Sequence, residues 1–219
     1  MTRSESRIID AAIRRGERVG GVRVLGLLRA RLGALGALAV LAEVAGQALR
    51  GEPFRRRLGP TRDLRDRRSR RQCTSLVLLD RALRRRIGAD ASFALAREAV
   101  RAGALPFLEA MIPRVSADEL GELAQALVER FFNADGEAAV DPSGEAFTYT
   151  VRRCRFVELL AAADASHLAP LFCEADNLFF DGGRRGVRLE RSETLASGGR
   201  RCDFRFTIAE AATDEAPEV

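Results

Sequence analysis

RRCRFVELLAAADASHLAPLFCEADNLFFDGG, residues 152–183, carries two helical patterns, and GGRRCDFRF, residues 198–206, leads into an alternating strand. These two segments hold three of the four cysteines in the chain, Cys154, Cys173 and Cys202, and its only histidine, His167. Such clustering suggests thiol chemistry. The simpler interpretation is that free cysteines are small core residues, because cysteine is among the most often buried residue types.

The segment from about residue 134 to residue 209 predicts a small antiparallel sheet packed with helices. Alternating apolar and polar residues indicate strands, and a 3.6-residue apolar repeat indicates helices. The expected strands are 147–151, 187–191 and 202–208, and the expected helices are 156–163 and 167–180. Ser166 is the expected N-cap of the second helix, because serine favours that position.

Helical periodicity dominates the chain before residue 134. The expected helices are 76–87, 90–102, a short segment at 105–112, and a helix with a capping box at Ser116 to Glu119. We therefore predict an α+β fold, with an N-terminal helical region followed by a small antiparallel sheet packed with helices. The expected parts are a basic helical extension and arm at 1–71, the α+β domain at 72–209, and an acidic, disordered tail at 210–219.

All 36 cationic residues are arginine, and the chain has no lysine. This excludes enzymes that need a P-loop lysine, a Schiff-base lysine or a lysine-bound pyridoxal phosphate. The arginine content also suggests a GC-rich bacterial genome, so it is not by itself a sign of nucleic-acid binding.

Residues 1–71 carry 18 arginines against seven acidic residues, and the run FRRRLGPTRDLRDRRSRR at 54–71 is the most basic part. We interpret this run as a solvated linker or arm, and contact with an acidic partner, membrane lipid or nucleic acid is the alternative. Phe54 is the only aromatic residue among its arginines. Because base stacking needs interleaved aromatic residues, we expect no nucleic-acid partner.

The apolar stretch 24–49 resembles a membrane span at first sight. Its uncharged core, Leu32 to Ala42, has only 11 residues, whereas a bilayer requires ~20. We expect no membrane span, and a helix that packs on the rest of the chain or on a second copy in a homo-oligomer. A cytoplasmic location with reduced thiols follows from this expectation.

Cys173 and Asp176 are one helical turn apart, which places the thiol and the carboxylate side by side. A thiolate nucleophile needs a proton acceptor beside it, and a carboxylate among apolar residues can act at neutral pH. A half-buried thiol next to a solvated aspartate is the alternative. Alternation points Cys202 inward with Phe204, and Cys154 lies at a strand end.

The three clustered cysteines and His167 have the chemistry of zinc ligands. Successive cysteines of this cluster are separated by 18 and 28 residues. The chain has no short Cys-x-x-Cys knuckle of the kind that structural zinc sites show. We therefore expect no cofactor and keep zinc as the alternative. His167 could equally be a surface residue in the first turn of a helix.

Three segments together, Val151–Cys154, Leu171–Asp176 and Arg191–Phe206, resemble the L-2-amino-thiazoline-4-carboxylic acid hydrolase family. The helices at about 74–133 are similar to that family too, so the hydrolase-like part is the domain 72–209. The resemblance implies a small-molecule substrate and hydrolytic opening of a thiazoline ring to an N-carbamoyl cysteine. We therefore expect a small-molecule hydrolase or lyase that cleaves a C–S or C–N bond with a cysteine and aspartate site.

The residues that match the family pattern imply the catalytic set, and we expect its members to line one pocket. They are Cys154, Cys173, Asp176 and Cys202. We expect Cys173 to be the nucleophile, since a helix dipole favours a thiolate near its N-terminus. The expected substrate-binding residues are Arg153 and Arg205, which could hold the substrate carboxylate, and His167.

Two other classes of function remain open. A sensor would bind a small molecule or a metal through the thiols without catalysis, and a structural protein would simply bury its cysteines. Thiol labelling discriminates between them, because the hydrolase predicts at least one fast, low-pKa cysteine, whereas a structural protein predicts slow labelling.

Overall fold

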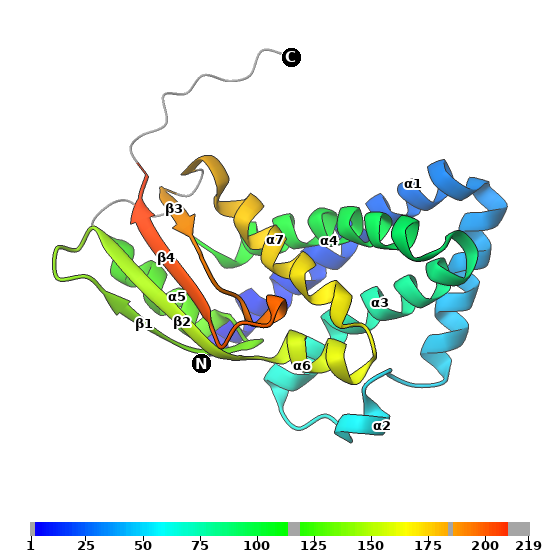
Figure 1. The fold of residues 1–219 in the computed structure, drawn as a ribbon, viewed down its shortest axis with the longest axis horizontal. Helices are drawn as coiled ribbons and strands as arrows, with labels where there is room; N and C mark the ends of the chain where they lie inside the picture. The colour runs from blue at the N-terminus through cyan, green and yellow to red at the C-terminus, as the bar shows by residue number, and fades with distance from the viewer. Residues whose placement is uncertain (1–2, 114–118, 184–185, 210–219) are drawn as a thin grey trace, which may run out of the picture.

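A computed structural model describes residues 3–113, 119–183 and 186–209. Long helices form one side of the molecule, and the antiparallel sheet forms the other (Figure 1). The α+β prediction is confirmed. The helices are α1 (Arg3–Leu49), α2 (Arg55–Leu58), α3 (Leu64–Ile87), α4 (Ala89–Met111), α5 (Leu120–Arg130), α6 (Arg155–Ala162) and α7 (Ala169–Phe180). The strands are β1 (Ala134–Val140), β2 (Ala146–Cys154), β3 (Val187–Glu190) and β4 (Cys202–Ile208).

Within the described residues the strand order is β1-β2-β4-β3, and every neighbouring pair is antiparallel. The register places Tyr149 opposite Phe204 and Val151 opposite Cys202 on the two central strands. Since successive side chains alternate between faces, these four residues and Phe206 share the face that packs on the helices. This face forms one wall of the candidate site.

Helix α1 contains the segment 24–49 that we expected to be helical, and it has a break that the sequence pattern did not predict. Gly33 has φ 70° and ψ 175°, so the helix bends there into two arms. The arm before Gly33 crosses α4 closely. A Cβ at Gly16 would lie 2.7 Å from the Gly103 carbonyl oxygen, so this crossing depends on glycine.

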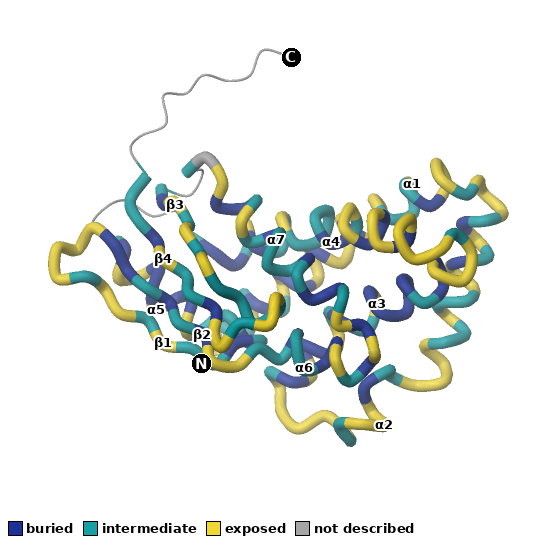
Figure 2. Tube along the Cα trace, in the orientation of Figure 1, coloured by how far each residue is buried: buried dark blue, intermediate teal, exposed yellow. Residues whose placement is uncertain are grey.

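Many residues in the arm of α1 after Gly33 are exposed (Figure 2), and large apolar residues are among them. Leu35, Leu38 and Leu49 are 84%, 63% and 90% exposed. By length and composition α1 is apolar enough to cross a membrane, and 17% of its most apolar window is buried inside the molecule. The absence of a membrane span and the contact with a second copy therefore stay predictions.

The interpretation of 54–71 as a solvated linker or arm is wrong for residues 64–71, which form the first part of helix α3, whereas most residues from 55 to 63 are exposed. Helix α3 begins at Leu64, and the Arg68 and Arg70 side chains are only 3% and 2% exposed. Arg70 forms ion pairs with Glu52 at 2.5 Å and with Asp66 at 3.1 Å. A charge is buried at acceptable cost when such partners satisfy it, and sequence reasoning could not see these partners.

Helix α3 also runs through the expected boundary between residues 71 and 72 without interruption. The division of the chain into an extension and a hydrolase-like domain stays a prediction, but that boundary falls inside a helix. The expected end at 87 is confirmed, because Gly88 has φ 82° directly after the last helical residue. Helix α4 joins the expected segments 90–102 and 105–112, with Pro106 inside it.

Strand β1 was missed, because its sequence ADGEAAV has one β-branched residue and a glycine. Strands β2, β3 and β4 and helix α6 lie where alternation and periodicity predicted them. Ser166 does not cap α7, which begins after a 3₁₀ turn and has Leu168 as its N-cap. Residues 116–118 of the expected capping box and the acidic tail 210–219 lie outside the described residues.

Candidate active site

A cavity of about 380 Å³ lies between the inner face of the sheet and the helices. The four residues of the expected catalytic set, Cys154, Cys173, Asp176 and Cys202, all line it. They come from the end of β2, from α7 and from the start of β4, which are distant in sequence. The expected shared pocket is therefore present, while the chemical role of each residue remains a prediction.

Asp176 is the ionisable group with the most unusual environment in this cavity. Its neighbours along the lining include Phe172, Phe180 and Phe204, so the carboxylate loses hydration. Burial raises the pKa of Asp176 from 3.8 to about 7, against the opposing charge of Arg191. A carboxyl group with this pKa can both accept and donate a proton near neutral pH.

Arg191 is a site residue that the sequence analysis did not identify. Its Nη1 lies 3.8 Å from Asp176 Oδ2, and its Nη2 donates hydrogen bonds to the Cys173 carbonyl oxygen at 2.8 Å and to Asn177 Oδ1 at 2.9 Å. The guanidinium also lies 5.1 Å from the ring centre of Phe204. Its side chain is 6% exposed, so it clamps α7 to the end of β3 and holds a positive charge behind Asp176.

Cys173 does not have the environment of a resting thiolate. Burial raises the pKa of its thiol to about 12, and the negative charge of Asp176 contributes in the same direction. The helix dipole that we expected to favour a thiolate is outweighed, because desolvation of a buried charge is the larger effect. Cys173 is therefore a neutral thiol at neutral pH.

Cys154 and Cys202 differ from Cys173 in having peptide N–H groups close to the sulfur. Burial raises the pKa of both thiols, whereas the N–H groups of Val157 and Phe156 lower that of Cys154. The Leu195 N–H donates a hydrogen bond to Cys202 Sγ at 3.3 Å. These N–H groups could stabilise negative charge on either sulfur.

Tyr149 is a second site residue that sequence reasoning missed. It lines the cavity and is 2% exposed, and among the described residues its hydroxyl has no hydrogen-bond partner. The ring fits because β1 has Gly136 nearby, where a Cβ would come within 2.9 Å of it. A buried hydroxyl without a partner is costly, so it is suited to bind a polar ligand atom. Tyr149 is the only tyrosine in the chain, and no sequence motif marked it as a site residue.

The three expected substrate-binding residues do not line this cavity. Arg153 forms an ion pair with Glu158 at 2.5 Å, and Arg205 forms one with Asp141 at 3.2 Å. Arg205 is on the opposite face of β4 from Phe204, as alternation requires. Arg205 therefore lies on the face of the sheet away from the thiols. Neither Arg153 nor Arg205 is placed to hold a substrate carboxylate in the cavity.

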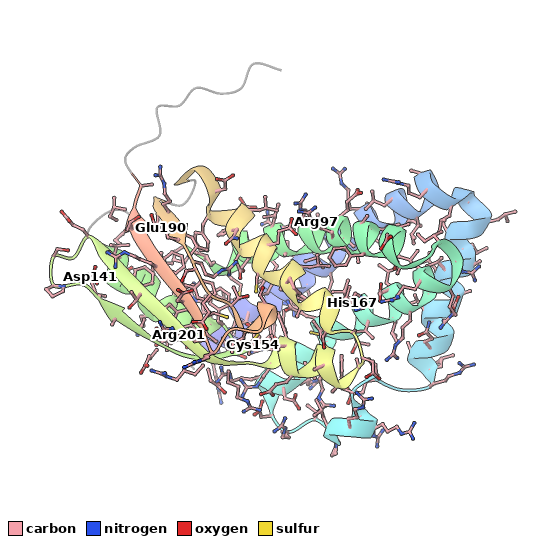
Figure 3. The ribbon with its side chains drawn as sticks, viewed as in Figure 1. Arg97, Asp141, Cys154, His167, Glu190 and Arg201 are labelled. Atoms are coloured by element: carbon pink, nitrogen blue, oxygen red, sulfur yellow. The ribbon has the colours of Figure 1, made fainter. Side chains whose placement is uncertain are left out.

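His167 also lies away from the thiols, beside α3, whereas Cys154 lies where β2 meets α6 (Figure 3). The His167 Nε2 is 3.1 Å from Asp80 Oδ2 and 3.1 Å from an Arg84 nitrogen. Among the described residues, no three His, Cys, Asp or Glu side chains are arranged to hold a metal ion. His167 and the thiols thus do not form the ligand set that the zinc alternative required.

The sequence comparisons support the resemblance on which this set rests. Neither a curated protein nor a solved structure matches the chain. The family model described as L-2-amino-thiazoline-4-carboxylic acid hydrolase matches residues 66–206, which is more than half of the chain and includes every residue of the expected catalytic set. This chain belongs to the L-2-amino-thiazoline-4-carboxylic acid hydrolase family.

Proposed function

We propose that this protein is a hydrolase that opens the C–S bond of a 2-aminothiazoline ring, with Asp176 moving protons and Cys173 attacking the ring. Membership of the family supports the reaction class. The observation that carries the proposal is a carboxyl group with a pKa of about 7 in a cavity shared with three thiols. Groups with pKa values displaced toward the working pH are typical of catalytic acids and bases.

In the first half of the reaction, the sulfur of Cys173 bonds to C2 of the ring while its proton passes to the Asp176 carboxylate. The adduct collapses by breaking the bond between C2 and the ring sulfur, which takes the proton from Asp176 and leaves as a thiol. The ring is then open, and C2 is bound to Cys173 as an isothiourea.

In the second half, Asp176 accepts a proton from water while the water oxygen bonds to C2. The bond between C2 and the Cys173 sulfur then breaks, and the oxygen becomes the carbonyl of an N-carbamoyl product. One proton of the water ends on the substrate nitrogen and the other on Cys173, so the enzyme is regenerated without a redox step.

The pKa values decide how the attack must occur. The thiol pKa of about 12 exceeds the Asp176 pKa of about 7, so complete proton transfer before attack would cost at most ~7 kcal/mol, since the charge of Asp176 that raises the thiol pKa is neutralised by the transfer. Typical turnover corresponds to barriers of ~13–17 kcal/mol, so this cost is tolerable. Transfer that accompanies C–S bond formation lowers it further, which explains why a neutral resting thiol is compatible with catalysis.

The Tyr149 hydroxyl completes the proposed site. Burial raises the pKa of Tyr149 above its usual range, so the hydroxyl stays protonated and can donate a hydrogen bond. A substrate nitrogen that gains negative charge as the adduct forms would satisfy this group. The substrate would therefore supply the partner that the hydroxyl lacks.

The test is the pH dependence of kcat/KM on a 2-aminothiazoline. We expect activity to rise with pH through about 7 in the unmodified protein, because Asp176 must be ionised to accept the proton. Asp176→Asn should remove this rise and most of the activity. Arg191→Gln should move it to higher pH, because the positive charge of Arg191 lowers the pKa of Asp176.

Glu174→Gln is the matched control, because Glu174 is on the same helix but forms ion pairs with Arg97 and Arg101 on α4. It should leave the pH profile unchanged. A fully active Asp176→Asn protein would contradict the proposal. Tight binding of the heterocycle without any turnover would instead favour the non-catalytic sensor.

A further inference from the structure

The cavity extends far beyond the four reactive residues, toward the arms of α1. We call this extension the apolar passage, lined by Val24, Leu41, Val44, Leu76, Leu79, Ala99 and Val100. It connects two separate hydrophobic clusters. One cluster includes Cys202, and the other includes Leu79 with Val24 and Val44 packed on it. The passage is thus continuous with the candidate active site but lies between other elements.

The two ends of the cavity differ in their access to solvent. The exposed residues of its lining all come from α1 and α3, and they are Glu17, Gly21, Leu41, Arg71 and Ser75. At the other end, Cys154, Cys173, Asp176 and Cys202 are each buried or half-buried. A ligand that enters between α1 and α3 therefore reaches the thiols through the apolar passage.

The charges along the cavity do not suit a substrate carboxylate. Among the described residues that line it, Arg71 is the only cationic one, and its Nε donates a hydrogen bond to Glu17 at 2.6 Å. At the thiol end the lining presents the acidic Asp176, and Arg191, which itself does not line the cavity, forms an ion pair with that group. Moving a carboxylate out of water into such a space without a free cation is strongly unfavourable.

We propose that the substrate of this protein carries an apolar tail in place of a ring carboxylate, with the tail in the apolar passage and the ring beside Asp176. The volume of about 380 Å³ is in the range of ~300–1,000 Å³ that is typical of drug-sized ligands. A single thiazoline ring would leave most of this space empty. The proposal rests on the proposed function, because that function places the ring beside Asp176 and the thiols.

The test measures binding rather than turnover, by calorimetry with 2-aminothiazoles that carry 4-alkyl chains of increasing length. These aromatic rings are not substrates, so the measurement is independent of catalysis. We expect affinity to rise about fourfold for each added methylene until the passage is filled. The 4-carboxylate analogue should bind more weakly than the 4-methyl compound. Affinity that does not rise with chain length would overturn the proposal.

Two glycine substitutions on the first arm of α1 form a matched pair. A Cβ at either Gly21 or Gly26 would meet no atom within 4 Å, so both positions accept a side chain. Gly21 lines the cavity and Gly26 does not. Gly21→Phe should remove the gain in affinity with chain length, and Gly26→Phe should keep it. Retention of the full gain in Gly21→Phe would show that the tail lies elsewhere.

The binding series also separates this proposal from the proposed function. A rise with chain length, together with failure to hydrolyse any 2-aminothiazoline, would support the tail site and overturn the assigned reaction. Hydrolysis of the 4-carboxylate, with no effect of chain length on affinity, would support the proposed function and overturn the proposal of an apolar tail. The two proposals therefore fail independently.

Discussion

The family-matched region, residues 66–206, and the region before it, residues 3–65, contribute different things to the same cavity. The thiols, Asp176, Arg191 and Tyr149 all belong to the matched region. Helix α1, which precedes that region, supplies one side of the opening and part of the apolar passage. Under the proposed function, the matched region supplies the reacting groups, and we infer that α1 governs which ligand can reach them.

Cys173→Ser is expected to have the largest effect among the changes that test the role of the matched region. We expect turnover to fall ~10³-fold with the fold intact, because a hydroxyl is a much weaker nucleophile when Asp176 is the only base beside it. Steady-state kinetics on a 2-aminothiazoline measures this loss. Cys154→Ser is the comparison variant, and a full loss there with an active Cys173→Ser protein would reassign the nucleophile.

Gly16→Ala tests whether α1 is an integral part of the fold. The new Cβ would lie 2.7 Å from the Gly103 carbonyl oxygen, which is backbone and cannot move aside freely. We expect the free energy of unfolding to fall by ~1–3 kcal/mol in urea titrations. Gly26→Ala, in open space on the same helix, should instead increase stability by up to ~1 kcal/mol. Equal effects of both changes would show that α1 does not pack closely on α4.

Asp176→Asn also has a stability effect with a defined pH dependence. The pKa of Asp176 rises from 3.8 in the unfolded chain to about 7 in the folded protein, so folding favours the protonated form. The stabilisation from this proton is complete below pH 3.8 and is lost as the pH rises through about 7. At pH 8, Asp176→Asn should therefore be more stable than the unmodified protein. The change in pKa corresponds to ~4 kcal/mol, and we expect about half of it, on the order of 2 kcal/mol, because the Asp176 side chain is 20% exposed and water screens its charge. The difference in the free energy of unfolding between the two proteins, measured by urea titration at several pH values, should shrink toward acidic pH. A difference that stays constant with pH would mean that folding does not raise the pKa of Asp176.

Cys202→Ser should have the smallest effect of the series, a loss of stability of about 1 kcal/mol. The residue is 5% exposed on the inner face of β4, where a hydroxyl has a poorer environment than a thiol. Its sulfur already accepts the Leu195 N–H, and a serine oxygen could keep that hydrogen bond. Thermal denaturation measures the change. A loss of turnover far beyond the loss of stability would give Cys202 a chemical role.

Much of the α+β fold could be predicted, because alternation and helical periodicity report which side of an element is apolar. Strands β2 and β4 and helix α6 show this, whereas β1 does not, since its short run of small residues has no clear period. The four members of the expected catalytic set were found through the family resemblance, and the structure places all four along one cavity. Arg191 and Tyr149 were not found, because no local pattern marks a residue whose partners are distant in sequence.

The sequence alone determined the family, the fold class and the identity of the clustered thiols and Asp176. Tertiary structure decided what surrounds them. Burial among residues from other elements sets the neutral thiol of Cys173 and the pKa of Asp176 near 7. The fold also places Arg191, and not Arg153 or Arg205, beside Asp176. It buries Arg70 within a basic run whose sequence predicts a solvated segment. The physical reason is that periodicity fixes the face on which a side chain lies, whereas hydration and charge depend on whatever the fold packs against that face.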